Sequence, residues 1–262
     1  MRLFAQFLTE NDCFAAGENL WARGVMVHST GANNPDLSRY VPGSEVIGRN
    51  TGGNHWNQSN SAWRKRFGAP LKKCVHAFIG KTADGSVATV QTMPWDMRAW
   101  HAGKSEGNGR YIGFEICEDG LEDPVYFAAV YREAVELVTM LCRQNGWDPL
   151  ADGVVICHAE GYRRGVASNH GDVLHWFPRH GKTMDDFRAD VARELEGGED
   201  MTQEQFDAML ENWLTRQEAK PVSEWARKLL DEARAEGITD GSRPQAFATR
   251  QEVAIMVASG KN

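Results

Sequence analysis

The chain has 262 residues, a formal net charge of −7 and a calculated isoelectric point near 5.6. This acidic balance argues against nucleic-acid binding, which requires a basic face. Hydrophobic residues make up 42% and charged residues 25% of the chain, and its length suffices for one sizeable domain with a small appendage. No stretch approaches the about 18 apolar residues that a membrane helix needs, so we expect no membrane insertion.

Cysteine usage and the amino terminus predict where the chain is made. The five cysteines, at positions 13, 74, 117, 142 and 157, contain no CxxC pair, which indicates a reduced protein without a disulfide framework. The first ten residues carry one positive charge and no apolar core, so they do not form a secretory signal. We therefore expect synthesis in the cytoplasm without a signal peptide.

Residues 1–196 are predicted to alternate between strands and helices in an α/β domain. The predicted strands are 24–30, 73–80, 86–93, 110–118 and 153–159, and the predicted helices are 11–19, 59–68, 125–145 and 184–196. Asp84-Gly85 predicts a hairpin turn between the second and third strands. Helix 125–145 has apolar residues at intervals of three and four and a stop at Asn145-Gly146, so we expect it to pack against the sheet.

Two segments, 31–58 and 160–181, lack periodicity, and we interpret them as functional rims or as plain surface loops. A polar break at 196–200 separates the first domain from residues 197–262, which we predict to form a small helical module. Its helix boundaries are marked by Thr202 with Gln205, by Ser223 and Gly237, and by Thr249 with Glu252.

Histidines follow two of the predicted strands. His28 comes after Val25-Met-Val27, and His158 comes after Val154-Val-Ile-Cys157. A neutral imidazole at a strand end is a good zinc ligand, although a hydrogen-bonded histidine at a sheet edge is the alternative. Several apolar runs that end in such residues indicate strands that bring their side chains to one edge of a sheet, where a metal site can assemble.

A carboxylate follows His158 at a distance of 14 residues. Two histidines with Asp172 would leave one open position on a tetrahedral zinc, which is the catalytic rather than the structural arrangement. His170 and His175 lie in the same segment, and either could replace Asp172 as the third ligand.

Glu115 lies among apolar residues in the strand Tyr111-Ile-Gly-Phe-Glu-Ile116. A carboxylate there is costly unless it has a partner. It is either a general base acting on a metal-bound water or one half of a salt bridge to a lysine or arginine.

Five strings occur in an order that resembles a known family: Val27-His28-Ser29-Thr30, Arg98-Ala-Trp-His-Ala-Gly103, Ile112-Gly-Phe-Glu115, Cys157-His158-Ala-Glu160 and Asp172-Val-Leu-His-Trp-Phe177. Over residues 20–190 they resemble the zinc-dependent N-acetylmuramoyl-L-alanine amidases of the amidase-2 type, which are related to peptidoglycan recognition proteins. The resemblance implies a central mixed β-sheet flanked by helices and peptidoglycan as the substrate.

The resemblance also implies roles for individual residues. The single zinc ion of the catalytic domain (1–196) would be bound by His28, His158 and Asp172, although the family's usual Asp-Pro-Gly is Asp172-Val-Leu here. Glu115 matches the acid that activates water, and His170 stands where the family commonly has a catalytic lysine. The resemblance places Thr30, Trp100 and His101 in the substrate groove.

Enzymes of this kind include endolysins of phages and prophages and bacterial autolysins. The missing secretory signal favours an endolysin, which acts on the cell wall after release by a holin or by lysis. The alternative is a non-catalytic peptidoglycan-recognition protein of the same fold. A weaker idea is a cysteine peptidase that uses Cys117 or Cys157. Residues 197–262 partly resemble an S-layer-homology repeat, which implies cell-wall binding or self-association as a homodimer.

Overall fold

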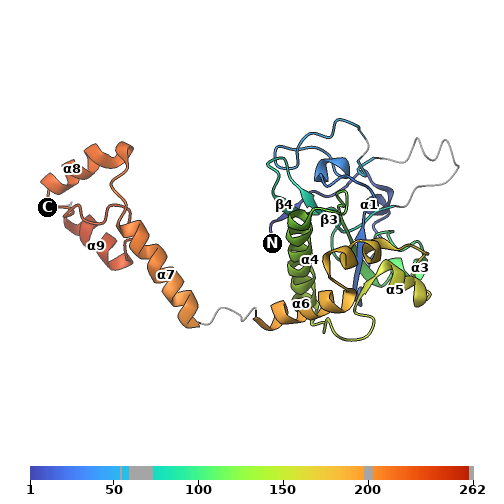
Figure 1. Cartoon of the computed structure of the whole chain (residues 1–262). Coiled ribbons are helices and arrows are strands. Elements are labelled where there is room, and N and C mark those ends of the chain that lie inside the picture. The colour runs from blue at the N-terminus through green and yellow to red at the C-terminus, as the bar shows by residue number, and fades with distance from the viewer. Residues whose placement is uncertain (54, 59–72, 198–202, 260–262) are drawn as a thin grey trace. The chain divides into compact units, whose positions relative to one another are not determined.

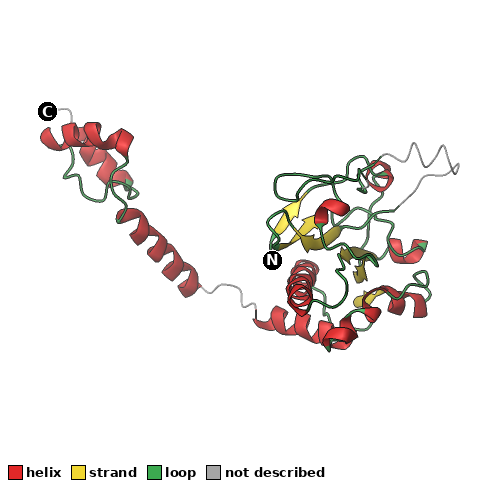
Figure 2. Ribbon diagram, turned by 45° about the horizontal axis from the view of Figure 1, so that its top comes forward, coloured by secondary structure: helices red, strands yellow, loops and turns green. Residues whose placement is uncertain are grey.

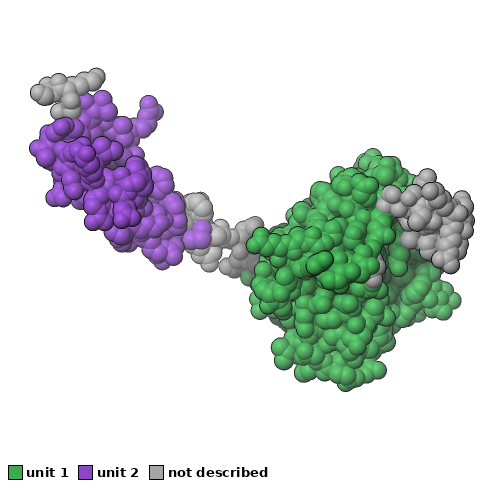
Figure 3. All heavy atoms as spheres, turned by 90° about the horizontal axis from the view of Figure 1, so that it is seen from above, with its two compact units in different colours: residues 1–198 green, residues 199–262 purple. Residues whose placement is uncertain are grey.

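The computed structural model describes residues 1–53, 55–58, 73–197 and 203–259. Contacts divide the chain into two compact units, Met1–Gly198 and Glu199–Asn262 (Figure 3). Each unit is described by itself below. In the described ranges, no helix is both long and apolar enough to cross a membrane.

The first unit is built on a six-stranded sheet in the order β1-β4-β3-β5-β2-β6. Its strands are β1 (Leu3–Ala5), β2 (Gly24–Ser29), β3 (Ala77–Lys81), β4 (Val87–Gln91), β5 (Tyr111–Ile116) and β6 (Val155–Cys157). The β3–β4 hairpin is antiparallel and every other pair is parallel, so the predicted mixed sheet is confirmed. Gly85, with φ of +80°, makes the predicted turn of that hairpin.

Helices cover the sheet (Figures 1 and 2). They are α1 (Asp12–Ala16), α3 (Ser105–Asn108), α4 (Pro124–Asn145), α5 (His158–Arg163) and α6 (Met184–Gly197), with short 3-10 helices η1 (Leu37–Arg39), η2 (Asp172–His175) and η3 (Phe177–His180). Helix α4 begins where the Asp123 carboxylate accepts hydrogen bonds from two backbone amides, and it ends at Gly146 in the left-handed conformation. It packs on α6 and on β3 and β4.

The alternation of side chains along the strands decides which face of the sheet carries the site. Val25 and Val27 of β2 join the apolar core under α4, as does Phe114 of β5. Successive side chains of a strand point to opposite faces. His28 and Glu115 therefore project from the face opposite α4.

Most predicted elements of the first unit are confirmed, with corrections at their ends. The strand predicted at 73–80 begins only at Ala77, and the strand predicted at 153–159 ends at Cys157 because His158 begins α5. The predicted helix 11–19 is limited to Asp12–Ala16, and the predicted helix 59–68 lies outside the described residues. Strand β1 and helices α3 and α5 were not predicted, because three to six residues are too few to establish a period.

The second unit is helical, with α7 (Gln203–Glu218), η4 (Glu224–Ala226), α8 (Arg227–Ala235) and α9 (Arg250–Ser259). The predicted capping box at Thr249 is confirmed. The Thr249 hydroxyl accepts from the Glu252 amide at 3.2 Å, and the Glu252 carboxylate accepts from the Thr249 amide at 2.7 Å. Gly237, with φ of +71°, follows α8 at the predicted stop.

Candidate metal centre

Three segments that are far apart in the sequence bring His28, His158 and Asp172 together. His28 lies near the carboxyl end of β2, and His158 follows β6, the neighbour of β2 in the sheet. Asp172 begins η2 with a φ of +43°, in the left-handed region that non-glycine residues seldom adopt. Both histidines are buried, and Asp172 is mostly buried.

The three side chains point their polar atoms at one another. The Asp172 Oδ2 atom lies 3.3 Å from His28 Nδ1 and 2.9 Å from His158 Nδ1, and the two Nδ1 atoms are 3.0 Å apart. Ligands about 2.1 Å from a tetrahedral zinc would be about 3.4 Å apart, so this triangle needs to open by only a few tenths of an ångström. Two nitrogens and a carboxylate oxygen are also ligands that zinc prefers, and the residues therefore fit the metal.

The protonation equilibria of the triad reflect the same closeness. Burial lowers the pKa of His28, against the raising effect of its hydrogen bond with Asp172. Burial alone would raise the pKa of Asp172, but the hydrogen bonds and charges of His158 and His28 outweigh it and lower that pKa well below its usual range. Near neutral pH the Asp172 carboxylate is thus ionised, as a metal ligand must be.

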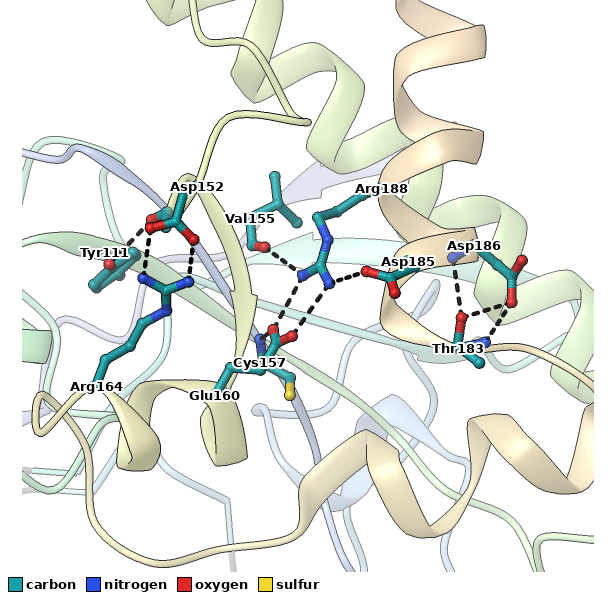
Figure 4. Close-up of polar contacts among 11 residues, drawn as sticks. Tyr111, Asp152, Val155, Cys157, Glu160, Arg164, Thr183, Asp185, Asp186 and Arg188 are labelled. Atoms are coloured by element: carbon teal, nitrogen blue, oxygen red, sulfur yellow. Dashed lines mark hydrogen bonds and ion pairs between the residues drawn. The ribbon is translucent and has the colours of Figure 1, made fainter.

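The junction between β6 and α5 positions His158. Figure 4 shows the polar contacts of Cys157, Glu160 and Arg188 at this junction. Glu160 Oε2 accepts a hydrogen bond from the Cys157 backbone amide at 3.0 Å, which caps the helix at its first turn. Arg188 of α6 donates to both oxygens of Glu160 and to the Val155 carbonyl. The turn that presents His158 is therefore tied both to its own strand and to α6.

The outer nitrogen of each histidine also has a partner. His28 Nε2 lies 2.9 Å from His101 Nδ1, and His158 Nε2 lies 3.1 Å from the Ser168 hydroxyl. The other ring nitrogen of His101 lies 3.0 Å from the Tyr111 carbonyl oxygen. Burial lowers the pKa of His101 well below its ordinary value, and the neighbouring His28 and His76 add to this effect.

Glu115 is the register partner of His28 on the adjacent strand β5. Its Oε2 atom is buried and has no hydrogen-bond partner among the described residues, and no salt bridge to it is found there. Burial raises the pKa of Glu115 well above its ordinary value, and the negative charge of Asp172 adds to this effect. A carboxyl group with a raised pKa beside a candidate metal centre has the properties of a general base.

The two other histidines of segment 160–181 lie outside the triad. The ring centroid of His170 is 4.8 Å from that of His158, and its Nδ1 is 3.0 Å from the Ser168 hydroxyl. His175 Nε2 instead lies 2.9 Å from Glu118 Oε1. Of the three candidates for the third ligand, Asp172 is the one that meets both His28 and His158.

The three residues expected in a substrate groove are held mainly by protein contacts. The Thr30 hydroxyl accepts from the Glu118 amide at 3.0 Å. The Trp100 ring lies 5.4 Å from the Arg98 guanidinium carbon, and both ring nitrogens of His101 have protein partners.

A cavity of about 540 Å³ lies beside the segment that follows β2. Its lining belongs to the aperiodic segment 31–58 and is mostly polar, with Asn33, Asn34, Asp36, Arg39, Arg49 and Asn50 among its residues. Segment 31–58, which the sequence analysis interprets as a functional rim or a surface loop, thus lines a cavity. The Ser168 contact was not predicted, because it has no periodic or motif-like signal in the sequence.

Comparisons with known proteins bear on the family. A sequence model described as N-acetylmuramoyl-L-alanine amidase matches residues 18–180, which is more than half of the chain. No curated protein matches the chain in sequence.

Solved structures are also similar. The Staphylococcus aureus hydrolase AmiA, in complex with its ligand, is 16% identical with a TM-score of 0.52, over 75% of this chain and 86% of that one. A PlyL mutant is 14% identical over 73% and 98% of the two chains (TM-score 0.49), and the XlyA catalytic domain is 19% identical over 73% and 99% (TM-score 0.46). The AmiA likeness supports the fold, and the family is shown by the sequence match over residues 18–180: this chain belongs to the N-acetylmuramoyl-L-alanine amidase family.

Proposed function

We propose that the chain is a zinc-dependent peptidoglycan amidase. It hydrolyses the amide between the lactyl group of N-acetylmuramic acid and L-alanine of the stem peptide. The observation that carries the proposal is the convergence of His28, His158 and Asp172, with polar atoms 2.9–3.3 Å apart. The family match supports the choice of bond.

Each residue of the site has a proposed role. His28, His158 and Asp172 would hold zinc, which when bound polarises a carbonyl oxygen and makes a coordinated water acidic near neutral pH. Glu115 accepts the proton of the attacking water and delivers it to the departing amine of L-alanine. His170 is proposed to donate a hydrogen bond to the oxyanion, and its exposure next to His158 supports this role.

The substrate side of the proposal rests on the cavity lined by segment 31–58. Its polar lining, with two arginines, suits a stem peptide that carries carboxylates and amides. Thr30 and Trp100 stay proposed substrate contacts.

Zinc content and the release of free amino groups from purified cell walls test the proposal. We expect one zinc per chain, and Glu115→Gln should keep the metal while losing most turnover. Glu133→Gln is the matched control, because Glu133 is a buried carboxylate of α4 that hydrogen-bonds to Thr89 away from the metal centre. A metal-free protein that cleaves at full rate would refute the zinc mechanism. Wall binding by zinc-loaded protein without release of amino groups would identify a recognition protein instead.

The biological setting and the second unit are further parts of the proposal. We propose that the enzyme is an endolysin that reaches the cell wall only after the membrane is breached. Cells that produce the protein should then lyse only once their membrane is permeabilised. The helical unit 199–262 is proposed to bind the wall or to self-associate. Cosedimentation with insoluble peptidoglycan and analytical ultracentrifugation of the full chain separate these two uses.

A further inference from the structure

We propose that the loop Trp100–Gly103 is a clamp that orients both histidine ligands, with His101 as a positioning residue rather than a substrate contact. The inference rests on the proposed function, because the histidines need orienting only if they hold a metal. The supporting observation is the partner of the Nε2 atom of each histidine ligand. One partner, His101, belongs to this loop, and the other, Ser168, hydrogen-bonds to it.

The first branch of the clamp runs through His101. The Tyr111 carbonyl oxygen can only accept a hydrogen bond, so the His101 Nε2 atom 3.0 Å away carries a proton. His101 Nδ1 is then free to accept from His28 Nε2 at 2.9 Å. With its proton held on Nε2, His28 presents the lone pair of Nδ1 to the centre of the triad.

The second branch runs through Ser168. The Ala102 carbonyl oxygen accepts from the Ser168 backbone amide at 2.8 Å and from its hydroxyl at 3.3 Å. The hydroxyl oxygen, which lies 3.1 Å from His158 Nε2, can then accept the proton of that nitrogen. His158 Nδ1, like His28 Nδ1, is left to face the triad, and His170 Nδ1 is the remaining neighbour of this hydroxyl at 3.0 Å.

Two glycines make room for the clamp. A Cβ atom on Gly113 would lie 2.4 Å from the ring of His101, so only glycine lets this imidazole lie against β5. Gly103 has a φ of +71°, and a Cβ there would lie 2.3 Å from the Ser168 hydroxyl. The strings Arg98–Gly103 and Ile112–Glu115 are thus two halves of one packing arrangement.

Hydrogen bonds to Asn108 also fix the backbone of the loop Trp100–Gly103. The buried Asn108 side chain accepts hydrogen bonds from the backbone amides of His101 at 2.9 Å and of Ala102 at 2.8 Å. Both branches of the clamp therefore begin at His101 and Ala102, whose backbone is fixed by Asn108. This leaves His101 little freedom to reach a substrate.

Zinc affinity of folded variants, measured by competition with a chromophoric chelator, tests the proposal. His101→Leu removes the acceptor for His28, and partners of this kind are worth about 10- to 100-fold in metal affinity. His101→Asn places an amide oxygen near the position of Nδ1 and should restore affinity to within about threefold of wild type. His76→Leu is the matched control, because His76 is a buried histidine whose ring lies beside that of His101 but hydrogen-bonds only to backbone groups of Met97 and Gly113.

Equal zinc affinities for wild type and His101→Leu would overturn the proposal, as would equal losses for His101→Leu and His76→Leu. If His101 contacts substrate instead, His101→Leu keeps the metal and raises KM. Wild-type protein that binds no zinc would refute the proposed function itself, so the two failures are distinguishable.

A measurement on wild type covers the case in which His101→Leu does not fold. In zinc-loaded, ¹⁵N-labelled protein we expect scalar coupling across the hydrogen bond between His28 Nε2 and His101 Nδ1. A His28 ring with its proton on Nδ1, or without this coupling, would overturn the clamp.

Discussion

The ion pair between Glu160 and Arg188 offers a quantitative test of how the fold presents His158. Glu160→Ala removes the acceptor of the Cys157 amide and two of the acceptors of the Arg188 guanidinium. Loss of a helix cap costs about 0.5–2 kcal/mol. Removing one partner of a fully buried ion pair costs about 3–5 kcal/mol. The second value must be discounted here, because the side chains are 17% and 18% exposed and Arg188 keeps Val155 and Asp185 as partners.

We therefore expect Glu160→Ala to lower the free energy of unfolding by about 2–4 kcal/mol. Glu160→Gln keeps an oxygen for the Cys157 amide and should lose less. The control is Asp152→Ala, which breaks the pair between Arg164 and Asp152 in the same region (Figure 4). Those side chains are 40% and 85% exposed, so this loss should be about 0–1 kcal/mol.

The assay is urea unfolding of metal-free protein, so that zinc binding does not contribute to stability. Zinc affinity is then measured on each folded variant, and we expect it to fall for Glu160→Ala and not for Asp152→Ala, because only Glu160 holds the turn that begins with His158. Equal stability losses in Glu160→Ala and Asp152→Ala would refute the reasoning.

Three further predictions concern the metal centre. In metal-free protein, folding raises the pKa of Glu115, so the folded state disfavours the ionised carboxylate. The stability that the protonated carboxyl contributes is fully present below its ordinary pKa of 4.5 and is lost as the pH rises toward the raised pKa. Glu115→Gln should therefore unfold at higher urea than wild type at pH 7 and at similar urea at pH 4, and a difference independent of pH would contradict this. Gly113→Ala forces the His101 ring to move and should cost about 1–3 kcal/mol. Gly197→Ala, where a Cβ meets open space, serves as its control, and equal unfolding midpoints for the two variants would count against the packing argument. Chelation of zinc should lower the melting temperature, since zinc at 100 times its dissociation constant adds about 2.7 kcal/mol to the free energy of unfolding. The melting temperature of His28→Ala should not change on chelation.

Local patterns were sufficient for much of the first unit. Helix α4 has both an apolar period and end signals, so its predicted range differs from the observed one by a single residue. Strands β2 and β5 were predicted because both segments are rich in β-branched, aromatic and other apolar residues. Short elements such as β1 and α5 depend on pairing and packing partners elsewhere in the chain, and no local window contains that information.

The sequence by itself determined the residue types of the site, since His28, Glu115 and His158 each follow or interrupt an apolar run that has to be a strand. Only the tertiary structure decided that Asp172 joins the histidines while His175 turns to Glu118, because segment 160–181 has no period from which side-chain directions could be deduced. It also decided that the His101 ring contacts His28, a placement that depends on the space left by Gly113, twelve residues further along the chain in β5. The types of the candidate site residues are thus a property of local sequence, whereas which of them meet, and in what geometry, is a property of how the strands and loops pack.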